Sequence, residues 1–301
     1  MQTFRANGKL LITGEYAVLD GALALAVPTQ KGQSLTVQSE PHHTRRIEWK
    51  SLRSDDSLWF EAHFDKNFTV LYTSDNQIAD TLRKVLSAAV LLNPDFLSGS
   101  EYYEVTTHLE FDEKYGLGTS STLIHNIAGW ARVNPYELLQ MTFTGSGYDI
   151  ACANADSSIF YRLQGGEPRV EPSFFSPHFQ NRLHFVYLNK KQNSREGITR
   201  YKAVKKDKTD YLREISELSR AAASAQTLNT FEVVLNEHED LTSKLLDIPR
   251  VCEQFPDYPG AVKSLGAWGG DFILACGDDA PDYFKQKGFP VIINWGDMVL
   301  E

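Results

Sequence analysis

Three features are scarce in this sequence: cysteines, long apolar runs and an excess of basic charge. The only cysteines among its 301 residues are Cys152, Cys252 and Cys276, and none has CxxC spacing. Three isolated cysteines argue against a secreted disulfide scaffold and favour a reducing compartment. No apolar run is long enough to span a bilayer, and the first residues lack the apolar core of a signal peptide. We therefore expect a cytoplasmic protein with no membrane partner.

Basic residues are outnumbered by acidic ones. The chain has 30 Lys and Arg against 39 Asp and Glu, which gives a formal net charge of -9. Without a long basic block, nucleic acid and anionic membranes are poor partners. Any anion site must therefore be local and built from backbone amides and a few cations. The histidines show no ligand spacing, so we expect no structural metal.

The remaining composition is that of a globular protein. Residues are 42% hydrophobic and 23% charged, and the length suits one large domain or two smaller ones. Composition changes over residues 171–181, which contain two prolines and few aliphatic residues. We therefore predict two domains, residues 1–175 and 176–301. Alternation predicts β-rich segments before an amphipathic helix at 76–92, and a strand at 183–188 followed by two helices and further strands.

Some boundaries are predicted within these segments. We expect a first strand interrupted at Asn7 and Gly8, and a second strand closed by Pro28. A polar cluster after the strand at 183–188, formed by Lys190, Lys191, Ser194 and Arg195, reads as a solvated loop, with contact to an acidic substrate as the alternative.

Residues 114–122, KYGLGTSST, form the most informative stretch. They follow a predicted strand and precede a predicted helix. Glycines allow the backbone to turn tightly, and the first N–H groups of a helix point outward at the positive end of its dipole. This arrangement suits a phosphate group. A plain helix N-cap made of Ser and Thr explains the stretch about equally well.

Two further glycine-containing segments resolve this ambiguity. In order, residues 7–19 (NGKLLITGEYAVL), 116–121 (GLGTSS) and 266–271 (GAWGGD) resemble the three motifs of the GHMP kinase superfamily, which includes galactokinase, homoserine kinase, mevalonate kinase and phosphomevalonate kinase. Together they span nearly the whole chain. Residues 147–151, GYDIA, resemble the signature of a subgroup close to the mevalonate-pathway kinases.

The resemblance implies a fold, an activity and cofactors. The implied fold is α+β with two domains: an N-terminal ATP-binding domain with a left-handed βαβ unit, and a ferredoxin-like C-terminal domain that closes the active site. The implied activity is transfer of a phosphoryl group from ATP, with Mg²⁺, to a hydroxyl of a small metabolite. Mevalonate is the expected acceptor; phosphomevalonate, homoserine and a sugar are alternatives. The oligomeric state stays open, with a homodimer as one alternative.

The resemblance also implies roles for individual residues. Asp149 would orient or deprotonate the acceptor hydroxyl, and Lys9 would hold that carboxylate ionised and offset charge on the γ-phosphate. Ser120 would place its hydroxyl on Mg²⁺. Plain alternatives are an N-cap for Asp149, helix capping for Thr119 and Ser120, and a solvated strand end for Lys9. The residues implied to bind the ATP phosphates are Gly116, Leu117, Gly118, Thr119, Ser120 and Ser121.

The acceptor would contact Glu15, Tyr16, Gly269 and Gly270. Two departures from the family pattern stand out: Trp268 occupies a glycine position and would crowd its loop, and the glutamate that helps to hold Mg²⁺ in mevalonate kinase has no clear counterpart. A non-catalytic nucleotide-binding relative is therefore the alternative from another class.

Overall fold

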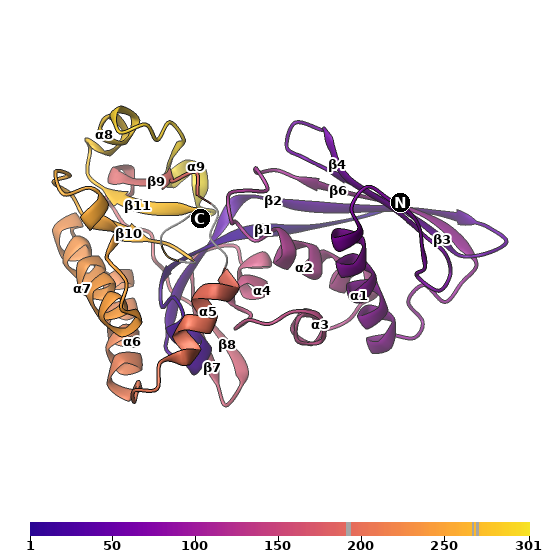
Figure 1. Ribbon diagram of the computed structural model, residues 1–301, viewed down its shortest axis with the longest axis horizontal. Helices are drawn as coiled ribbons and strands as arrows, with labels where there is room; N and C mark the ends of the chain where they lie inside the picture. Colours follow the sequence, from indigo (N-terminus) through magenta and orange to yellow (C-terminus); the bar gives the residue numbers. More distant parts are fainter. Residues whose placement is uncertain (191–193, 267, 269–270) are drawn as a thin grey trace. The chain divides into compact units, whose positions relative to one another are not determined.

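The computed structural model, drawn in Figure 1, describes residues 1–190, 194–266, 268 and 271–301. The chain divides into two compact units. Unit 1 comprises residues 1–8, 31–113 and 117–154, and unit 2 comprises residues 9–30, 114–116 and 155–301. The predicted domain boundary between residues 175 and 176 stays a prediction.

Unit 1 is a mixed sheet with helices. The described strands follow the order β5-β4-β3-β6-β2, with β3 parallel to β6 and the other neighbours antiparallel. Helix α1 lies between β3 and β6 in the sequence, and the hand of this connection stays a prediction. Strand β1 (Gln2–Thr13) begins in unit 1 and β2 (Ala24–Pro41) ends there. The other elements are β3 (Arg46–Leu52), β4 (Leu58–Phe64), β5 (Val70–Thr73), α1 (Asn76–Leu92), β6 (Glu101–Leu109), α2 (Thr119–Ala131), α3 (Pro135–Thr142) and α4 (Tyr148–Ala153).

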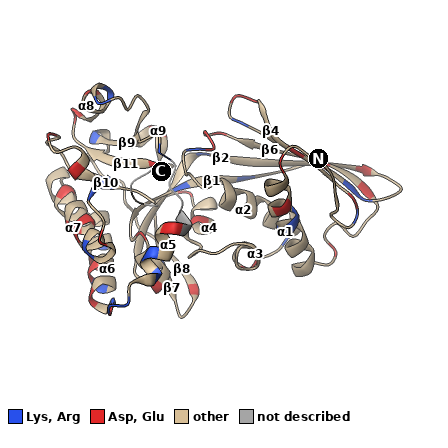
Figure 2. Cartoon of the chain, viewed as in Figure 1, with Lys and Arg blue, Asp and Glu red and all other residues tan. Residues whose placement is uncertain are grey.

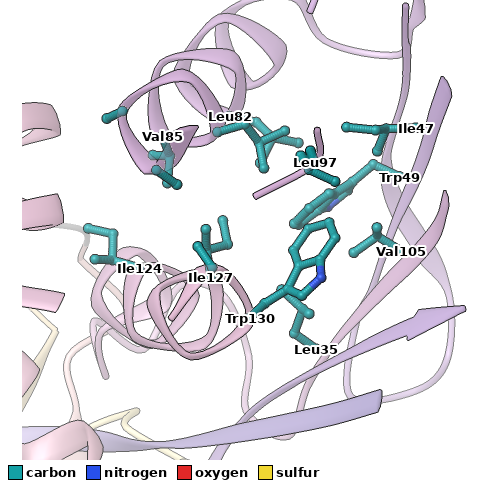
Figure 3. Close-up of a cluster of buried hydrophobic side chains, with 14 of the residues drawn as sticks. Leu35, Ile47, Trp49, Leu82, Val85, Leu97, Val105, Ile124, Ile127 and Trp130 are labelled. Carbon is teal, nitrogen blue, oxygen red and sulfur yellow. The ribbon is translucent and has the colours of Figure 1, made fainter. Parts of the chain in front are cut away.

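One face of this sheet is buried, because side chains on β3, β4 and β6 alternate between buried and more exposed positions. Figure 3 shows how α1 and α2 cover the buried face. Val85 points from α1 and Ile127 from α2 into the space between the two helices, and Leu82 and Trp49 of β3 belong to the same cluster. The helical and strand periodicities of the sequence thus meet in one apolar core.

Unit 2 contains a second, four-stranded antiparallel sheet in the order β10-β11-β9-β12. If the four strands are numbered along the chain from β9 (1) to β12 (4), their order in the sheet is 2-3-1-4. Helices lie between strands 1 and 2 and between strands 3 and 4. This is the ferredoxin-like βαββαβ pattern that the resemblance implied. The strands of this sheet are β9 (Leu183–Tyr187), β10 (Val262–Ser264), β11 (Phe272–Cys276) and β12 (Ile292–Asn294). The helices that connect them are α5 (Ser194–Ala203), α6 (Thr209–Ser224), α7 (Leu228–Leu246) and α8 (Ala280–Gln286).

Shorter elements complete unit 2. Strand β7 pairs with residues 24–26 of β2 and with β8. The bounds are η1 (Ala17–Asp20), β7 (Ile159–Gln164), β8 (Glu167–Pro172), η2 (Gln180–Arg182), η3 (Val251–Gln254) and α9 (Trp295–Met298). Among the described residues, the helices are too short or too polar to cross a membrane.

Two predicted strand boundaries are wrong. Strand β1 continues through Asn7 and Gly8, and the amide oxygen of Asn7 accepts a 2.7 Å hydrogen bond from Arg5 Nη1. Strand β2 continues through Pro28 and pairs with β1; in addition, residues 24–26 pair with β7, whereas residues 33–41 pair with β6. Pro28 lies between these two paired stretches, so its missing N–H interrupts neither ladder.

The helix predictions fared differently from one another. Helix α1 has the predicted bounds, and the side chain of Asp75 accepts hydrogen bonds from the N–H groups of Gln77 and Ile78 at its start. The predicted solvated loop around Ser194 and Arg195 is wrong, because residues 194–203 form α5. Lys191 lies outside the described residues. A low apolar content hid this helix from the sequence pattern.

The core of unit 1 predicts a stability difference between two matched helix substitutions. Ile127→Ala removes a fully buried side chain from α2, whereas Leu91→Ala truncates a side chain that is 72% exposed on α1. We expect Ile127→Ala to lower the free energy of unfolding by about 2–5 kcal/mol. We expect Leu91→Ala to lower it by less than about 0.5 kcal/mol. Urea titrations followed by circular dichroism measure both, and equal losses would contradict the core assignment.

Candidate active site

The predicted phosphate-binding turn leads into α2 through Gly118. Gly118 is the N-cap residue and has a left-handed conformation with φ 100°, which glycine adopts without steric cost. As a glycine it has no side chain to cap the helix. Ser120 lies in the first turn with an exposed side chain. The helix therefore begins without a capping side chain from its N-cap residue, as an anion site requires.

The neighbouring hydroxyls brace the turn. Ser121 Oγ donates a 2.9 Å hydrogen bond to the carbonyl oxygen of Gly118. Thr122 Oγ1 donates to Gln33 Oε1 at 2.7 Å. The alternative in which a Ser or Thr serves as the N-cap of α2 is wrong, because Gly118 holds that position. The predicted phosphate contacts of residues 116–121 stay predictions.

Asp149 lies in the first turn of α4, and its side chain is half-buried. The N-cap of α4 is Gly147, in a left-handed conformation with φ 86°, so the N-cap alternative for Asp149 is wrong. Burial raises the pKa of Tyr136 on α3 to about 12, and the nearby Cys152 and Asp149 add to this effect. Helix α4 also packs on α2 within unit 1. The structure therefore places Asp149 on a helix that packs against α2, and its catalytic role stays a prediction.

In unit 2, Lys9 and the turn come into contact. Lys9 Nζ donates a 2.7 Å hydrogen bond to the carbonyl oxygen of Gly116. Asp271, the last residue of the third motif, lies on the other side of Gly116. A Cβ atom built on Gly116 would be only 2.4 Å from Asp271 Oδ2. Residues of all three glycine-containing motifs therefore meet at Gly116.

The segment before Gly116 is docked on the four-stranded sheet. The ring of Tyr115 packs against Tyr187 of β9 and Phe272 of β11, with centroids 4.9 and 5.2 Å away. Tyr187 also donates its hydroxyl proton to the carbonyl oxygen of Lys114 at 3.3 Å. Aromatic packing on both neighbouring strands fixes the position of Gly116 in unit 2.

Glu15 lies in a buried cluster of charged groups that sequence reasoning missed. Its Oε1 accepts a 2.6 Å hydrogen bond from Lys263 Nζ, and both side chains are fully buried. Lys263 also donates to the carbonyl oxygen of Ser264 at 2.8 Å. Burial raises the pKa of Glu15, and the Lys263 ammonium acts in the opposite direction. The substrate contact predicted for Glu15 stays a prediction.

Two side chains of α7 complete this cluster. His238 Nε2 accepts a 2.9 Å hydrogen bond from the N–H of Gly14 and lies 3.4 Å from Glu15 Oε2. Burial and the charge of Lys263 hold the pKa of His238 well below its usual value, so the imidazole is neutral. Glu239 accepts a 3.0 Å hydrogen bond from the N–H of Ser264, and burial raises its pKa to about 7.

A weak signal for this cluster exists in the sequence. Lys263 interrupts an otherwise apolar and small run, residues 261–267, that leads into the third motif. Charged residues elsewhere on the helices of unit 2 have mixed signs along α6 and α7, as Figure 2 shows. A lysine in an apolar strand is the unusual case, because an isolated buried ammonium requires a partner.

Tyr16 follows Glu15 and has a strained backbone. Its φ of 61° is uncommon for a residue with a bulky side chain. The ring is buried and stacks on Tyr201 of α5, with centroids 6.0 Å apart. Burial, together with the charge of Glu15, raises the pKa of its hydroxyl to about 12. The predicted substrate contact of Tyr16 stays a prediction.

The third motif is described in part. Trp268 is buried in an apolar cluster with Tyr16, Tyr201 and Tyr211, so its indole packs into the core of unit 2. Whether it crowds its loop stays a prediction, because the neighbouring loop residues lie outside the described ones. Its backbone is left-handed, with φ 49°, as expected at a position where the resemblance places glycine. Gly269 and Gly270, the other predicted substrate contacts, lie outside the described residues.

Comparison with known proteins was made by sequence and by structure. No protein-family model matches the sequence, and a search of curated proteins finds no match. Solved structures do match over nearly the full length. The L. major mevalonate kinase in complex with R-mevalonate aligns with a TM-score of 0.67 at 16% identity, over 98% of this chain and 95% of that one.

Two further matches extend the comparison to other acceptors. The Streptococcus pneumoniae phosphomevalonate kinase in complex with phosphomevalonate and AMPPNP aligns with a TM-score of 0.69 at 16% identity, over 98% of this chain and 100% of that one. The Lactococcus lactis galactokinase complexed with galactose aligns with a TM-score of 0.69 at 12% identity, over 99% and 93%. The chain therefore has the predicted α+β fold of the GHMP kinases, and the resemblance of its motifs is confirmed at the level of the fold.

The buried ion pair predicts a strong and partner-dependent effect on stability. Lys263→Met leaves Glu15 buried without its cation, which we expect to lower the free energy of unfolding by about 3–5 kcal/mol. The double variant Lys263→Met/Glu15→Gln removes both charges and should recover part of that loss. The exposed Lys285→Met serves as the control. Urea titration measures all three, and a loss in Lys263→Met no larger than in the control would refute the assignment.

Glu239 predicts a pH dependence of stability. Its folded pKa of about 7 lies above its ordinary value of 4.5, so the folded chain binds this proton more tightly than the unfolded chain. The resulting stabilisation is complete below pH 4.5 and is lost as the pH rises through about 7. Relative to Glu239→Gln, the wild type should lose about 3 kcal/mol between pH 4.5 and 8.

The measurement is the difference in unfolding free energy between the two proteins at several pH values. Taking the difference cancels the other titrating groups, including His238, whose depressed pKa acts in the opposite direction. A difference that does not change with pH would contradict the raised pKa of Glu239.

Proposed function

We propose that this chain is a small-molecule kinase that transfers the γ-phosphoryl group of ATP to a hydroxyl, with mevalonate as the acceptor. The observation that supports the proposal best is the meeting of three motifs at one glycine. Lys9 bonds to the carbonyl oxygen of Gly116, and Asp271 lies against the same residue. Residues far apart in the sequence are thus gathered at the start of the predicted phosphate-binding turn.

The turn supplies groups suited to the triphosphate of a nucleotide such as ATP. Gly118 begins the 13-residue helix α2, so the N–H groups of its first turn are oriented toward a ligand at its positive end. The exposed hydroxyl of Ser120 fits a ligand of Mg²⁺, which prefers oxygen donors. When bound, Mg²⁺ would neutralise charge that develops on the phosphates. In this proposal Thr119 and Ser121 contribute to the phosphate-binding turn.

Asp149 and Lys9 have separate roles in the proposal. Asp149 accepts or orients the proton of the acceptor hydroxyl, and its half-buried position on α4 limits the orientations of its carboxylate. Lys9 brings a positive charge to the transferred phosphoryl group. Phosphoryl transfer needs alignment and charge neutralisation more than covalent chemistry, so two such groups with a metal are sufficient.

Phosphomevalonate is the second candidate acceptor. Lys9, Lys114 and Lys190 lie in or next to the segments that surround Gly116, and additional cations would suit a substrate that carries a phosphate. The two acceptors differ by one dianionic group. A direct comparison of the two as substrates therefore decides between them.

The test is ADP release at saturating Mg-ATP with mevalonate, phosphomevalonate, homoserine and galactose. We expect activity with mevalonate, and we expect Asp149→Asn to reduce turnover by about 100-fold or more while ATP binding by calorimetry stays within about 3-fold. The matched control is Asp156→Asn, a carboxylate just beyond α4. Activity with another acceptor alone would reassign the substrate, and ATP binding without turnover on any acceptor would favour a non-catalytic relative.

A further inference from the structure

Two charged side chains contact Gly116 in unit 2. Lys9 Nζ bonds to its carbonyl oxygen at 2.7 Å, and the carboxylate of Asp271 fills the space where a side chain at position 116 would begin. The nearest atoms to a Cβ built there are Asp271 Oδ2 at 2.4 Å and Cγ at 2.7 Å. Gly116 also has a left-handed backbone, with φ 66°. Only glycine fits this position while Asp271 keeps its place.

The backbone of Asp271 is held firmly. Its N–H donates to the carbonyl oxygen of Lys190 at 2.8 Å, and its carbonyl oxygen accepts from the N–H of Leu188 at 2.8 Å. Both partners lie just after β9. Asp271 nevertheless adopts φ 48°, a left-handed conformation that disfavours residues other than glycine by about 1–2 kcal/mol. The two hydrogen bonds and the start of β11 at Phe272 maintain this conformation and aim the carboxylate at Gly116.

Gly116 is held from its own side of the contact. Tyr115 packs on β9 and β11, and the carbonyl oxygen of Lys114 accepts a hydrogen bond from Tyr187. Because Tyr187 and Phe272 are paired residues of the sheet, both sides of the contact between Gly116 and Asp271 are attached to the same strand pair. The contact is therefore a built feature of unit 2.

Positive charges outnumber negative ones at this contact, because three lysines and one aspartate lie at or near it. Lys9 and Asp271 touch the same residue, so they lie within one Debye length, about 8 Å at physiological salt. Lys114 lies two residues before Gly116, the carbonyl oxygen of Lys190 accepts a hydrogen bond from the N–H of Asp271, and both lysine side chains are exposed. Lys9 carries three N–H donors, and the carbonyl oxygen of Gly116 takes one of them. A fixed carboxylate nearby favours the charged form of the ammonium and limits where it can go.

We propose that Asp271 is a positioning residue, which shapes the turn at Gly116 and limits where the Lys9 ammonium beside it can go. Asp271 acts through these two residues and not on the acceptor. Its consequence for turnover depends on the proposed kinase function, but its effect on Lys9 does not.

The first experiment reads Lys9 directly. Wild type, Asp271→Asn and the control Asp282→Asn, whose carboxylate is exposed on α8, are labelled with a limiting amount of acetic anhydride over a range of pH. Mass spectrometry compares labelling of Lys9 with that of Lys84, an exposed lysine on α1, far in the sequence from both substituted positions. We expect Lys9 in Asp271→Asn to react about 3-fold faster or more at pH 8, because loss of the carboxylate removes an attraction that restrains the amine and leaves it more accessible to the reagent.

The second experiment reads turnover with the acceptor identified in the panel. We expect Asp271→Asn to lower kcat by about 10-fold to 100-fold, because a misplacement near 1 Å has effects of this size, with KM for ATP changed by less than about 3-fold. A structural role confined to packing would leave kcat unchanged, since asparagine has nearly the same shape as aspartate. If Asp271→Asn does not fold, judged by circular dichroism, Asp271→Ser takes its place in both experiments.

The outcomes separate this proposal from the proposed function. Wild-type labelling of Lys9 in the variant overturns the positioning role whether or not the protein is a kinase. Faster labelling of Lys9 with an unchanged kcat overturns the proposed contribution of Asp271 to turnover. An inactive wild type refutes the proposed function alone, and the labelling experiment still decides whether Asp271 holds Lys9. A raised Mg²⁺ requirement in Asp271→Asn, with unchanged Lys9 labelling, would make Asp271 a metal ligand and overturn the role proposed here.

Discussion

The buried ion pair between Lys263 and Glu15 is the interaction on which the centre of unit 2 depends. Each charged group loses several kcal/mol of hydration on burial, and only a close partner and further hydrogen bonds compensate for this loss. Lys263 obtains both from Glu15 and the carbonyl oxygen of Ser264. The requirement fixes β10 against the segment that precedes η1, and His238 and Glu239 bring α7 to the same place.

Positive φ values lie on both sides of Glu15. Gly14 has φ 94°, which glycine adopts without cost, and a Cβ there would meet that of Ala24 at 2.7 Å, while Tyr16 has a φ of 61° in spite of its large side chain. Such conformations persist only where the surroundings determine them strongly. Here Glu15 is anchored by Lys263, and the ring of Tyr16 is packed among Tyr201, Tyr211 and Trp268. These contacts hold the middle of the first motif in place around its buried carboxylate.

The charges around Gly116 act in a different environment. Gly116 is exposed and Lys9 and Asp271 are half-buried, so their interaction is screened by water and contributes little to the stability of the fold. The interaction instead affects where these groups lie, because backbone hydrogen bonds and aromatic packing hold the segments that carry them. Unit 2 thus contains one ionic arrangement that is dry and structural and another that water and ligands can reach.

The sequence by itself determined the features that local periodicity and short motifs encode. These include the bounds of α1, the strand that begins at residue 183, the glycine turn before α2 and, through three motifs in order, the α+β fold. The helix α5, the continuation of β2 through Pro28 and the burial of Lys263 were decided by tertiary structure. Local patterns show which face of an element is apolar, but they do not show which distant segment covers it. The place of a charged side chain, in water or in the core, depends on that distant partner, as Lys263 with Glu15 and Asp271 with Gly116 demonstrate.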